Sequence, residues 1–271
     1  MRYFCFKDKK IPLGKKTYVM GILNVTPDSF SDGGKNFSVE NATLSAIEME
    51  KQGADFIDVG AQSTRPGATL ISEKEEWDRL KAVLPKIIGS VKIPVSVDTF
   101  YPFVAKKSLE LGASIINDVS GTVSLEMAEI IKEYNAGWVL MHNCEVENDP
   151  ICEVHSALNF MRDTAVKYGV KLENVCLDPG IGFAKTMEQN RLLIKETQKV
   201  RVDSNAYLLG VSRKRVIGFP LGQETEPKDR DFATISANTI GILGGADIIR
   251  VHNVAAAVQS AKVSDYILRE V

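Results

Sequence analysis

Residues 175–185 read Val175-Cys176-Leu177-Asp178-Pro179-Gly180-Ile181-Gly182-Phe183-Ala184-Lys185. The short apolar run at the start is typical of a buried strand, and the Pro-Gly turn ends it. An acidic residue, Asp178, follows the apolar run directly. It is therefore expected at the carboxyl end of a parallel strand, where α/β folds bind their ligands.

The same arrangement recurs along the chain. Apolar runs predict strands at Tyr18–Leu23, Asp55–Val59, Ile93–Val97, Ser114–Ile116, Gly137–Met141, Asn174–Leu177, Ala206–Val211 and Ile248–Val251. Amphipathic segments between them predict helices at Val39–Gln52, 74–88, Pro102–Leu111, Leu125–Tyr134, Ala157–Tyr168, Glu188–Val200, Asp231–Leu243 and Ala255–Leu268. The strands are continuous apolar runs, which is the pattern of strands covered on both faces. Residues 1–17 predict a small hairpin ahead of them.

Eight strand–helix pairs within about 250 residues predict an α/β fold, the (β/α)8 TIM barrel, with a short N-terminal β-hairpin. A doubly wound sheet also alternates strands and helices, but no Gly-x-Gly-x-x-Gly follows the first predicted strand. No linker or change of composition divides the chain. We therefore expect a single domain covering residues 1–271, with the hairpin at 1–17.

The composition excludes several classes of partner. The 271 residues are 44% hydrophobic and include 33 basic and 35 acidic residues, for a formal net charge of −2. A balance of this kind provides no broad basic field, so we expect neither a nucleic-acid nor a membrane partner. No apolar run approaches the ~20 residues of a membrane span, and the N-terminus does not resemble a signal peptide, so we expect a cytoplasmic protein. The four cysteines form no CxxC pair, and His142 and Cys144 alone do not make a zinc site.

Polar residues end nearly every predicted strand. Any one of them could be a loop cap, but their convergence on one rim of a barrel predicts a ligand site. Asp98, Asn117 and Asp178 supply two carboxylates and an amide, which suit a ligand edge rich in N–H donors, such as an amino-pyrimidinone. Metal chelation is the competing use, although Asn117 is a poor ligand for it and no third carboxylate is obvious.

A second group of strand-end residues is basic. Arg213 and Lys214 follow the seventh predicted strand, and Arg250 and His252 belong to the eighth. The loops after these two strands commonly hold a phosphate in this fold, and Arg and Lys both bind phosphate. The alternative for Lys214 and Arg215 is the solvated start of a helix.

Taken in order, the motifs of the chain resemble those of the dihydropteroate synthase family. They are Asn24-Val25-Thr26-Pro27-Asp28-Ser29-Phe30-Ser31-Asp32-Gly33-Gly34, Ser63-Thr64-Arg65-Pro66-Gly67, Ser96-Val97-Asp98-Thr99, Ile116-Asn117-Asp118, Met141-His142, Asp178-Pro179-Gly180-Ile181-Gly182-Phe183, Ser212-Arg213-Lys214 and Arg250-Val251-His252. Each is weak alone, but the ordered set from about residue 18 to residue 254 is specific.

The resemblance implies condensation of 6-hydroxymethyl-7,8-dihydropterin diphosphate with 4-aminobenzoate, with release of pyrophosphate. It implies that Asp98, Asn117, Asp178 and Lys214 hold the pterin, and that Asp98, Asp178 and Lys214 serve catalysis. Asn24, Arg250 and His252 would bind the diphosphate, with Mg²⁺ near Asn24. Thr64, Arg65, Pro66, Phe183 and Ser212 would form the aminobenzoate site, with the 25–37 and 63–72 loops closing over it. Family precedent also favours a homodimer.

Two positions depart from the family pattern. Gly60-Ala61-Gln62 stands where the family commonly has Gly-Gly-Glu, and Asn253 follows His252 where an Asp is common. Each change deletes a negative charge near loops that would handle a diphosphate. Two alternatives remain: a methyltetrahydrofolate-dependent corrinoid methyltransferase, which has no use for a diphosphate site, and a catalytically silent pterin-binding protein.

Overall fold

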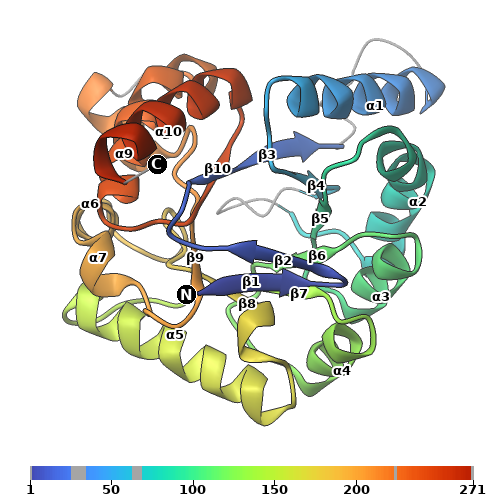
Figure 1. Cartoon of the computed structure of the whole chain (residues 1–271), viewed down its shortest axis with the longest axis horizontal. Helices are drawn as coiled ribbons and strands as arrows, with labels where there is room; N and C mark the ends of the chain where they lie inside the picture. The colour runs from blue at the N-terminus through green and yellow to red at the C-terminus, as the bar shows by residue number, and fades with distance from the viewer. Residues whose placement is uncertain (1, 26–34, 63–68, 223–224, 270–271) are drawn as a thin grey trace.

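A computed structural model describes residues 2–25, 35–62, 69–222 and 225–269; of residues 35–38 it describes the backbone alone. In it, parallel strands close into a barrel in the order β10-β3-β4-β5-β6-β7-β8-β9 (Figure 1). The barrel strands are β3 (Tyr18–Asn24), β4 (Phe56–Gly60), β5 (Val95–Asp98), β6 (Ile115–Asp118), β7 (Gly137–Met141), β8 (Val175–Asp178), β9 (Ala206–Leu209) and β10 (Ile248–Val251). The predicted barrel is confirmed.

Helices surround the barrel on its outside (Figure 1). They are α1 (Lys35–Lys51), α2 (Glu73–Ser90), α3 (Pro102–Glu110), α4 (Leu125–Glu133), α5 (Pro150–Lys167), α6 (Met187–Lys195), α7 (Thr197–Val200), α8 (Arg215–Gly218), α9 (Asp231–Leu243) and α10 (Val254–Leu268). Short 3₁₀ turns lie at Leu172–Asn174, Phe219–Leu221 and Pro227–Arg230. Across the described ranges, none of the helices is both long and apolar enough to span a membrane.

Three helix predictions differ from the structure, and the first of these helices, predicted at Val39–Gln52, begins at Lys35. The helix predicted at Ala157–Tyr168 begins seven residues earlier, because Asp149 caps it through its side chain and Pro150 takes the first helical position. The helix predicted at Glu188–Val200 is interrupted at Glu196, so that α6 and α7 are separate.

The predicted N-terminal hairpin is also confirmed, and it closes one end of the barrel. Its strands, β1 (Tyr3–Phe6) and β2 (Lys9–Pro12), pair antiparallel and lie across the barrel in Figure 1. Phe4 and Phe6 are fully buried and belong to one apolar cluster with residues from the starts of the barrel strands, including Phe56 and Ile115. The amino-terminal end of the barrel is therefore filled by apolar side chains.

The polar residues of the site lie one inward position above this apolar layer. Side chains on a strand alternate between its two faces, so inward positions recur every second residue. Phe56, Ile115, Cys176 and Ile248 belong to the apolar cluster inside the barrel. The residues two positions later are Asp58, Asn117, Asp178 and Arg250. An apolar plug thus supports a polar layer that opens toward the carboxyl ends of the strands.

Candidate active site

Four polar side chains form a connected network inside the barrel. Asp58 Oδ2 accepts hydrogen bonds from Arg250 Nε at 2.6 Å and from Asn117 Nδ2 at 2.9 Å. Arg250 Nη2 donates to Asp98 Oδ2 at 2.7 Å. Register explains part of this arrangement, because Asp98 pairs with Gly60 on one side and with Asn117 on the other. Charge-assisted bonds of this length are stronger than neutral ones and hold the side chains in fixed directions.

Gly60 makes room within this network. A Cβ atom at Gly60 would lie 3.4 Å from Asp98 Cβ and 3.7 Å from Asn24 Oδ1. Asn24 pairs with Gly60 in the barrel register, so the Asn24 amide and the Asp98 carboxylate flank a strand position that has no side chain. The predicted diphosphate residue Asn24 therefore lies next to the predicted pterin residue Asp98.

Asp178 and Lys214 form a second part of the site. Asp178 Oδ1 accepts from the Gly180 backbone N–H at 2.7 Å, and its charge acts on Lys214. The Lys214 ammonium hydrogen-bonds the Ile181 carbonyl and lies 4.7 Å from the centre of the Phe183 ring. A cation in this position over an aromatic face is attracted by the ring. The structure thus brings together Asp178, Lys214 and Phe183, all three of them predicted site residues.

Lys185 holds the loop after β8 in place through hydrogen bonds to backbone carbonyls. The Lys185 ammonium donates to the carbonyls of His142 at 3.2 Å, Gly180 at 3.1 Å and Phe183 at 3.1 Å. Gly180 has φ +68°, and a Cβ there would meet the His142 carbonyl oxygen at 1.9 Å, so only glycine fits. These contacts set the positions of Asp178 and Phe183.

Burial changes the acid–base properties of these groups. It raises the pKa of Asp98 to about 7, against the opposing effect of Arg250. Burial likewise raises the pKa of Asp178, which Lys214 opposes. The pKa of Lys214 falls to about 8, again mainly through burial. Shifts of this kind, in groups of opposite charge that face one another in a barrel mouth, are typical of functional sites.

Ser212 and His252 meet at the neighbouring rim. Ser212 Oγ lies 2.9 Å from His252 Nδ1 and also accepts from the His252 backbone N–H at 3.1 Å. The loop after β9 thereby joins the end of β10. A residue assigned to aminobenzoate and a residue assigned to diphosphate are in direct contact.

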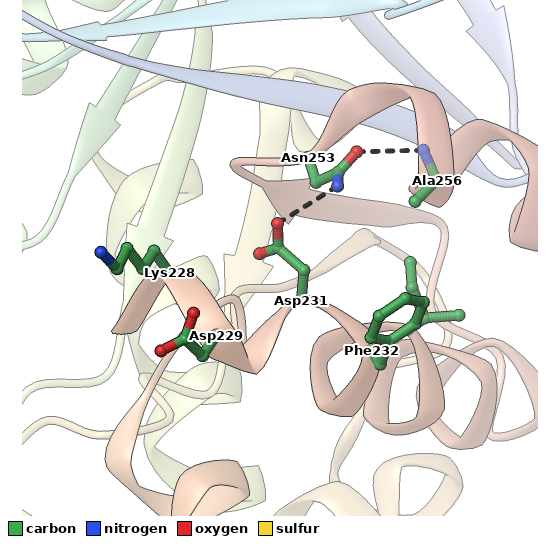
Figure 2. Close-up of a pocket in the computed structure, with 7 residues that line it drawn as sticks. Lys228, Asp229, Asp231, Phe232, Asn253 and Ala256 are labelled. Carbon is green, nitrogen blue, oxygen red and sulfur yellow. Dashed lines mark hydrogen bonds between the residues drawn. The ribbon is translucent and has the colours of Figure 1, made fainter. Parts of the chain in front are cut away.

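Arg213, unlike the other basic residues of the site, forms a two-point ion pair with a carboxylate on α9. Its Nε and Nη2 donate to the two carboxylate oxygens of Asp231 at 2.7 and 2.9 Å, so its fork is already engaged. Asp231 also accepts from Asn253 Nδ2 at 3.1 Å (Figure 2). A cavity of about 320 Å³ lies beside this cluster and is lined by Lys228, Asp229, Asp231, Phe232, Ile235, Asn253 and Ala256. Arg215 is exposed at the start of α8, as in the helix-start alternative.

Residues 20–252 match the pterin binding enzyme family. The dihydropteroate synthase of Clostridium beijerinckii is 41% identical over 269 residues, which cover 96% of this chain and 98% of its own length. That of Bacillus subtilis is 42% identical over 97% of this chain and 93% of its own. The chain belongs to the dihydropteroate synthase family.

Solved structures of this family superpose closely on the barrel. Clostridium difficile dihydropteroate synthase, determined in the presence of pteroic acid, is 40% identical, has a TM-score of 0.91 and covers 96% of this chain and 100% of its own. Xanthomonas albilineans dihydropteroate synthase with 4-aminobenzoic acid is 35% identical, with a TM-score of 0.89 and 94% coverage of both chains.

Both departures from the family pattern lie beside carboxylates. Gln62 Nε2 donates to Glu76 Oε2 at 2.7 Å, and Glu76 is fully buried. Asn253 caps α10 by accepting from the Ala256 N–H at 3.2 Å while its amide nitrogen binds Asp231 (Figure 2). At both positions a side-chain amide donates a hydrogen bond to a neighbouring carboxylate, whereas the acidic residue common in the family would repel that carboxylate.

Part of the predicted site lies outside the described residues. Thr64, Arg65 and Pro66 of the predicted aminobenzoate site belong to this part, as do most of the two loops predicted to close. Conversely, Asp58 was not predicted, although it is bonded to two predicted site residues. The signal that could have found it is the alternation of inward positions, since Asp58 stands two residues after the buried Phe56.

The residues fit Mg²⁺ only as an ion shared with a phosphate ligand. Asn24 offers one neutral amide oxygen at the barrel rim. Among the residues whose positions are described, no group of three or more His, Cys, Asp or Glu side chains gathers to hold a metal. Mg²⁺ commonly uses one or two protein ligands together with substrate phosphates and water, and this mode needs no such cluster.

Proposed function

We propose that this protein condenses 6-hydroxymethyl-7,8-dihydropterin diphosphate with 4-aminobenzoate to give 7,8-dihydropteroate and pyrophosphate, as a transferase of folate biosynthesis. The observation that carries the proposal is the group of polar side chains inside the barrel: Asp98, Asn117 and Asp178 supply hydrogen-bond acceptors, with Arg250 and Lys214 beside them. A pterin ring with its diphosphate tail needs this combination of acceptors and cations.

The pterin is assigned to the wall formed by β5, β6 and β8. The carboxylates of Asp98 and Asp178 accept N–H bonds from the ring edge, and the Asn117 amide adds a third partner. Lys214, held over Phe183, contacts the ring from the side of the β9 loop. The apolar plug below prevents the ring from sinking further into the barrel.

The diphosphate is assigned to the rim above Arg250. Arg250 Nη1 makes no hydrogen bond to any described residue, while Nε and Nη2 are engaged, so one face of the guanidinium remains for an anion. His252 and Asn24 complete this side. Mg²⁺ near Asn24 would neutralise charge on the leaving pyrophosphate when it is bound.

The chemistry follows from these positions. The C–O bond at the pterin methylene breaks, its electron pair leaves with pyrophosphate, and positive charge develops on the dihydropterin. The carboxylates of Asp98 and Asp178 stabilise that charge. The amine nitrogen of 4-aminobenzoate then forms the new C–N bond and loses one proton to pyrophosphate or solvent. Thr64, Arg65, Pro66, Phe183 and Ser212 are assigned to 4-aminobenzoate.

We further propose that residues 1–271 work as one domain, that the protein is a homodimer and that it acts in the cytoplasm. The hairpin supports a single domain because its aromatic side chains fill the barrel end. Large apolar side chains on α9 and α10 support a dimer, since Phe232, Tyr266 and Ile267 are 88%, 81% and 72% exposed. The four free cysteines suit a reducing compartment.

The decisive experiment measures pyrophosphate release. We expect release when both substrates and Mg²⁺ are present, and dihydropteroate in equal amount. A catalytically silent pterin-binding protein would bind the pterin and release nothing. A corrinoid methyltransferase would not bind pyrophosphate, which titration calorimetry can check separately. Either result would overturn the proposal.

A further inference from the structure

Asp58 occupies the centre of the polar network and is itself shielded from solvent. Its side chain is 0% exposed, and its Oδ2 accepts from Arg250 and Asn117 together. In the strand order of the barrel, Arg250 is on β10, two strands to one side of β4, and Asn117 is on β6, two strands to the other. One carboxylate therefore connects the residue assigned to diphosphate with a residue assigned to the pterin.

The contact with Asn117 sets the direction of an amide. A carboxamide has a donor end and an acceptor end, and either could face a ligand. An ionised carboxylate accepts hydrogen bonds only, so Asp58 requires the NH₂ end of Asn117. The carbonyl oxygen of Asn117 is then turned away from Asp58, and the pterin meets an acceptor there.

The contact with Arg250 sets the direction of a guanidinium. Nε is bound to Asp58 and Nη2 to Asp98, on adjacent strands β4 and β5. A planar fork held at two corners cannot rotate without losing charge-assisted bonds. The remaining nitrogen of the guanidinium, Nη1, therefore points in a fixed direction.

We propose that Asp58 is a positioning residue that touches neither substrate but orients Asn117 for the pterin and Arg250 for the diphosphate. The inference rests on the proposed function, and it makes the two halves of the substrate depend on one buried carboxylate. Its absence of exposure argues against direct contact with a ligand. The Asp98 side chain, by comparison, is 10% exposed and is assigned to direct contact.

The test combines two ligands with double-mutant cycles. 6-Hydroxymethylpterin reports on the pterin site and inorganic pyrophosphate on the diphosphate site, each by titration calorimetry. We expect Asp58→Ala to weaken both at least about tenfold, as for the loss of hydrogen bonds to a charged group. Asp58→Asn keeps an acceptor oxygen and should hold pterin affinity within about threefold of the wild type.

The cycles separate positioning from a general defect. In an Asn117→Ala background, Asp58→Ala should no longer weaken the pterin but should still weaken pyrophosphate. In an Arg250→Ala background, Asp58→Ala should no longer weaken pyrophosphate binding but should still weaken pterin binding. Full, additive losses in both backgrounds would overturn the proposal, because they would indicate direct contact or loss of structure.

Two controls keep the outcomes distinct. If circular dichroism shows that Asp58→Ala is not folded, Asp58→Ser, whose short side chain cannot reach both donors, replaces it in the same cycles. The wild type is titrated first: if it binds neither ligand, the proposed function fails and this inference fails with it. Wild-type binding with unaltered affinities in Asp58→Ala, or in the Asp58→Ser variant that replaces it, would overturn the inference alone.

Discussion

Lys214 and Asp98 carry opposite charges at the barrel mouth, and burial shifts the pKa of each toward neutrality. The pKa of Asp98 rises to about 7 and that of Lys214 falls to about 8. Asp98 accepts N–H bonds best when it is ionised, which requires a pH above about 7. Lys214 is a cation only below about pH 8. The two requirements overlap in a narrow range.

We therefore expect the affinity for 6-hydroxymethylpterin to be highest between about pH 7 and pH 8. On the acid side Asp98 gains a proton and loses acceptor strength; on the alkaline side Lys214 loses its charge. Calorimetric titrations from pH 5.5 to pH 9.5 would show an acid limb and an alkaline limb, the two ranges in which affinity falls. The positions of these limbs report the pKa values of groups in the free protein.

Lys214→Arg is the matched control for the alkaline limb. A guanidinium keeps its proton throughout this range, so the limb should disappear even if absolute affinity falls. Lys185 also has a pKa lowered to about 8 by burial. An alkaline limb that persists in Lys214→Arg would assign it to Lys185 and contradict the prediction.

At the level of elements, the end of β4 and the helix α2 are joined by the pair Gln62 and Glu76. Burial, together with the nearby charge of Asp98, raises the pKa of Glu76 to about 7. The amide of Gln62 donates to this carboxylate. With the Glu that the family commonly has at position 62, two buried carboxyl groups would face each other, and one would need a proton.

Gln62→Glu should therefore destabilise the protein in a pH-dependent way. The folded-state pKa of the pair would lie above that of the unfolded chain, so stability is retained at low pH and lost as pH rises through the folded pKa. We expect a small loss near pH 5 and about 1–3 kcal/mol at pH 8, since one pKa unit corresponds to about 1.4 kcal/mol. Urea unfolding at both values measures it.

The swapped variant Gln62→Glu/Glu76→Gln provides the control. It restores one amide and one carboxylate in mirrored order, and the stability at pH 8 should return toward that of the wild type. Equal losses at pH 5 and pH 8 in Gln62→Glu would show that the charge pair is not responsible.

The N-terminal hairpin is the second element with a measurable role. Phe6 is fully buried in the plug, and its ring lies 6.0 Å from that of Phe56. Phe6→Ala should cost about 3–5 kcal/mol, the usual loss for a buried aromatic side chain. Lys9, exposed on the same hairpin, should change stability by less than about 0.5 kcal/mol when replaced by Ala. Thermal unfolding of the two variants compares them directly.

The plug and the site can also be separated functionally. Because Phe6 lies at the amino-terminal end of the barrel, Phe6→Ala should leave pyrophosphate affinity within about twofold at temperatures where the variant is folded. A large loss of affinity under those conditions would mean that the plug positions the polar layer above it.

The barrel could be predicted because its signal is local and repeated. Each strand is a continuous apolar run, and each ends near a polar residue. The hydrophobic pattern and the alternating order of strands and helices were therefore sufficient to predict the barrel. The start of α5 could also have been found, because Asp149-Pro150 is a helix-start signal in the sequence. The short helix α8 and the 3₁₀ turns after β9 have too few residues for a periodic pattern.

The side-chain network of the site could not be predicted in the same way. Asp58 binds Arg250, 192 positions away in the chain, and Asn117, 59 positions away. Such pairs depend on strand order and register, which no local pattern contains. Arg213 illustrates the same limit: its position suggested a phosphate ligand, whereas Asp231, the first residue of α9, accepts from two nitrogens of its guanidinium.

At the scale of the whole molecule, α9 and α10 form an apolar surface on the outside of the barrel. The two helices pack side by side (Figure 1), and Phe232, Leu243, Tyr266 and Ile267 are each at least 60% exposed. We expect these exposed apolar side chains to form a protein–protein interface, which exposed apolar patches commonly mark. A second copy of the same chain would bury both surfaces together, in the two-fold arrangement usual for homodimers.

We expect the wild type to sediment as a dimer at micromolar concentration and Ile267→Asp to sediment as a monomer, because a charge buried in the interface would be unpaired. Phe160→Asp is the matched control: Phe160 is also 72% exposed, but it lies on α5, on another side of the barrel (Figure 1). That variant should remain a dimer. Pyrophosphate affinity should be the same in all three proteins, since the polar layer lies within one barrel. A monomeric wild type, or dissociation by Phe160→Asp in place of Ile267→Asp, would show that the α9–α10 surface is not the dimer interface.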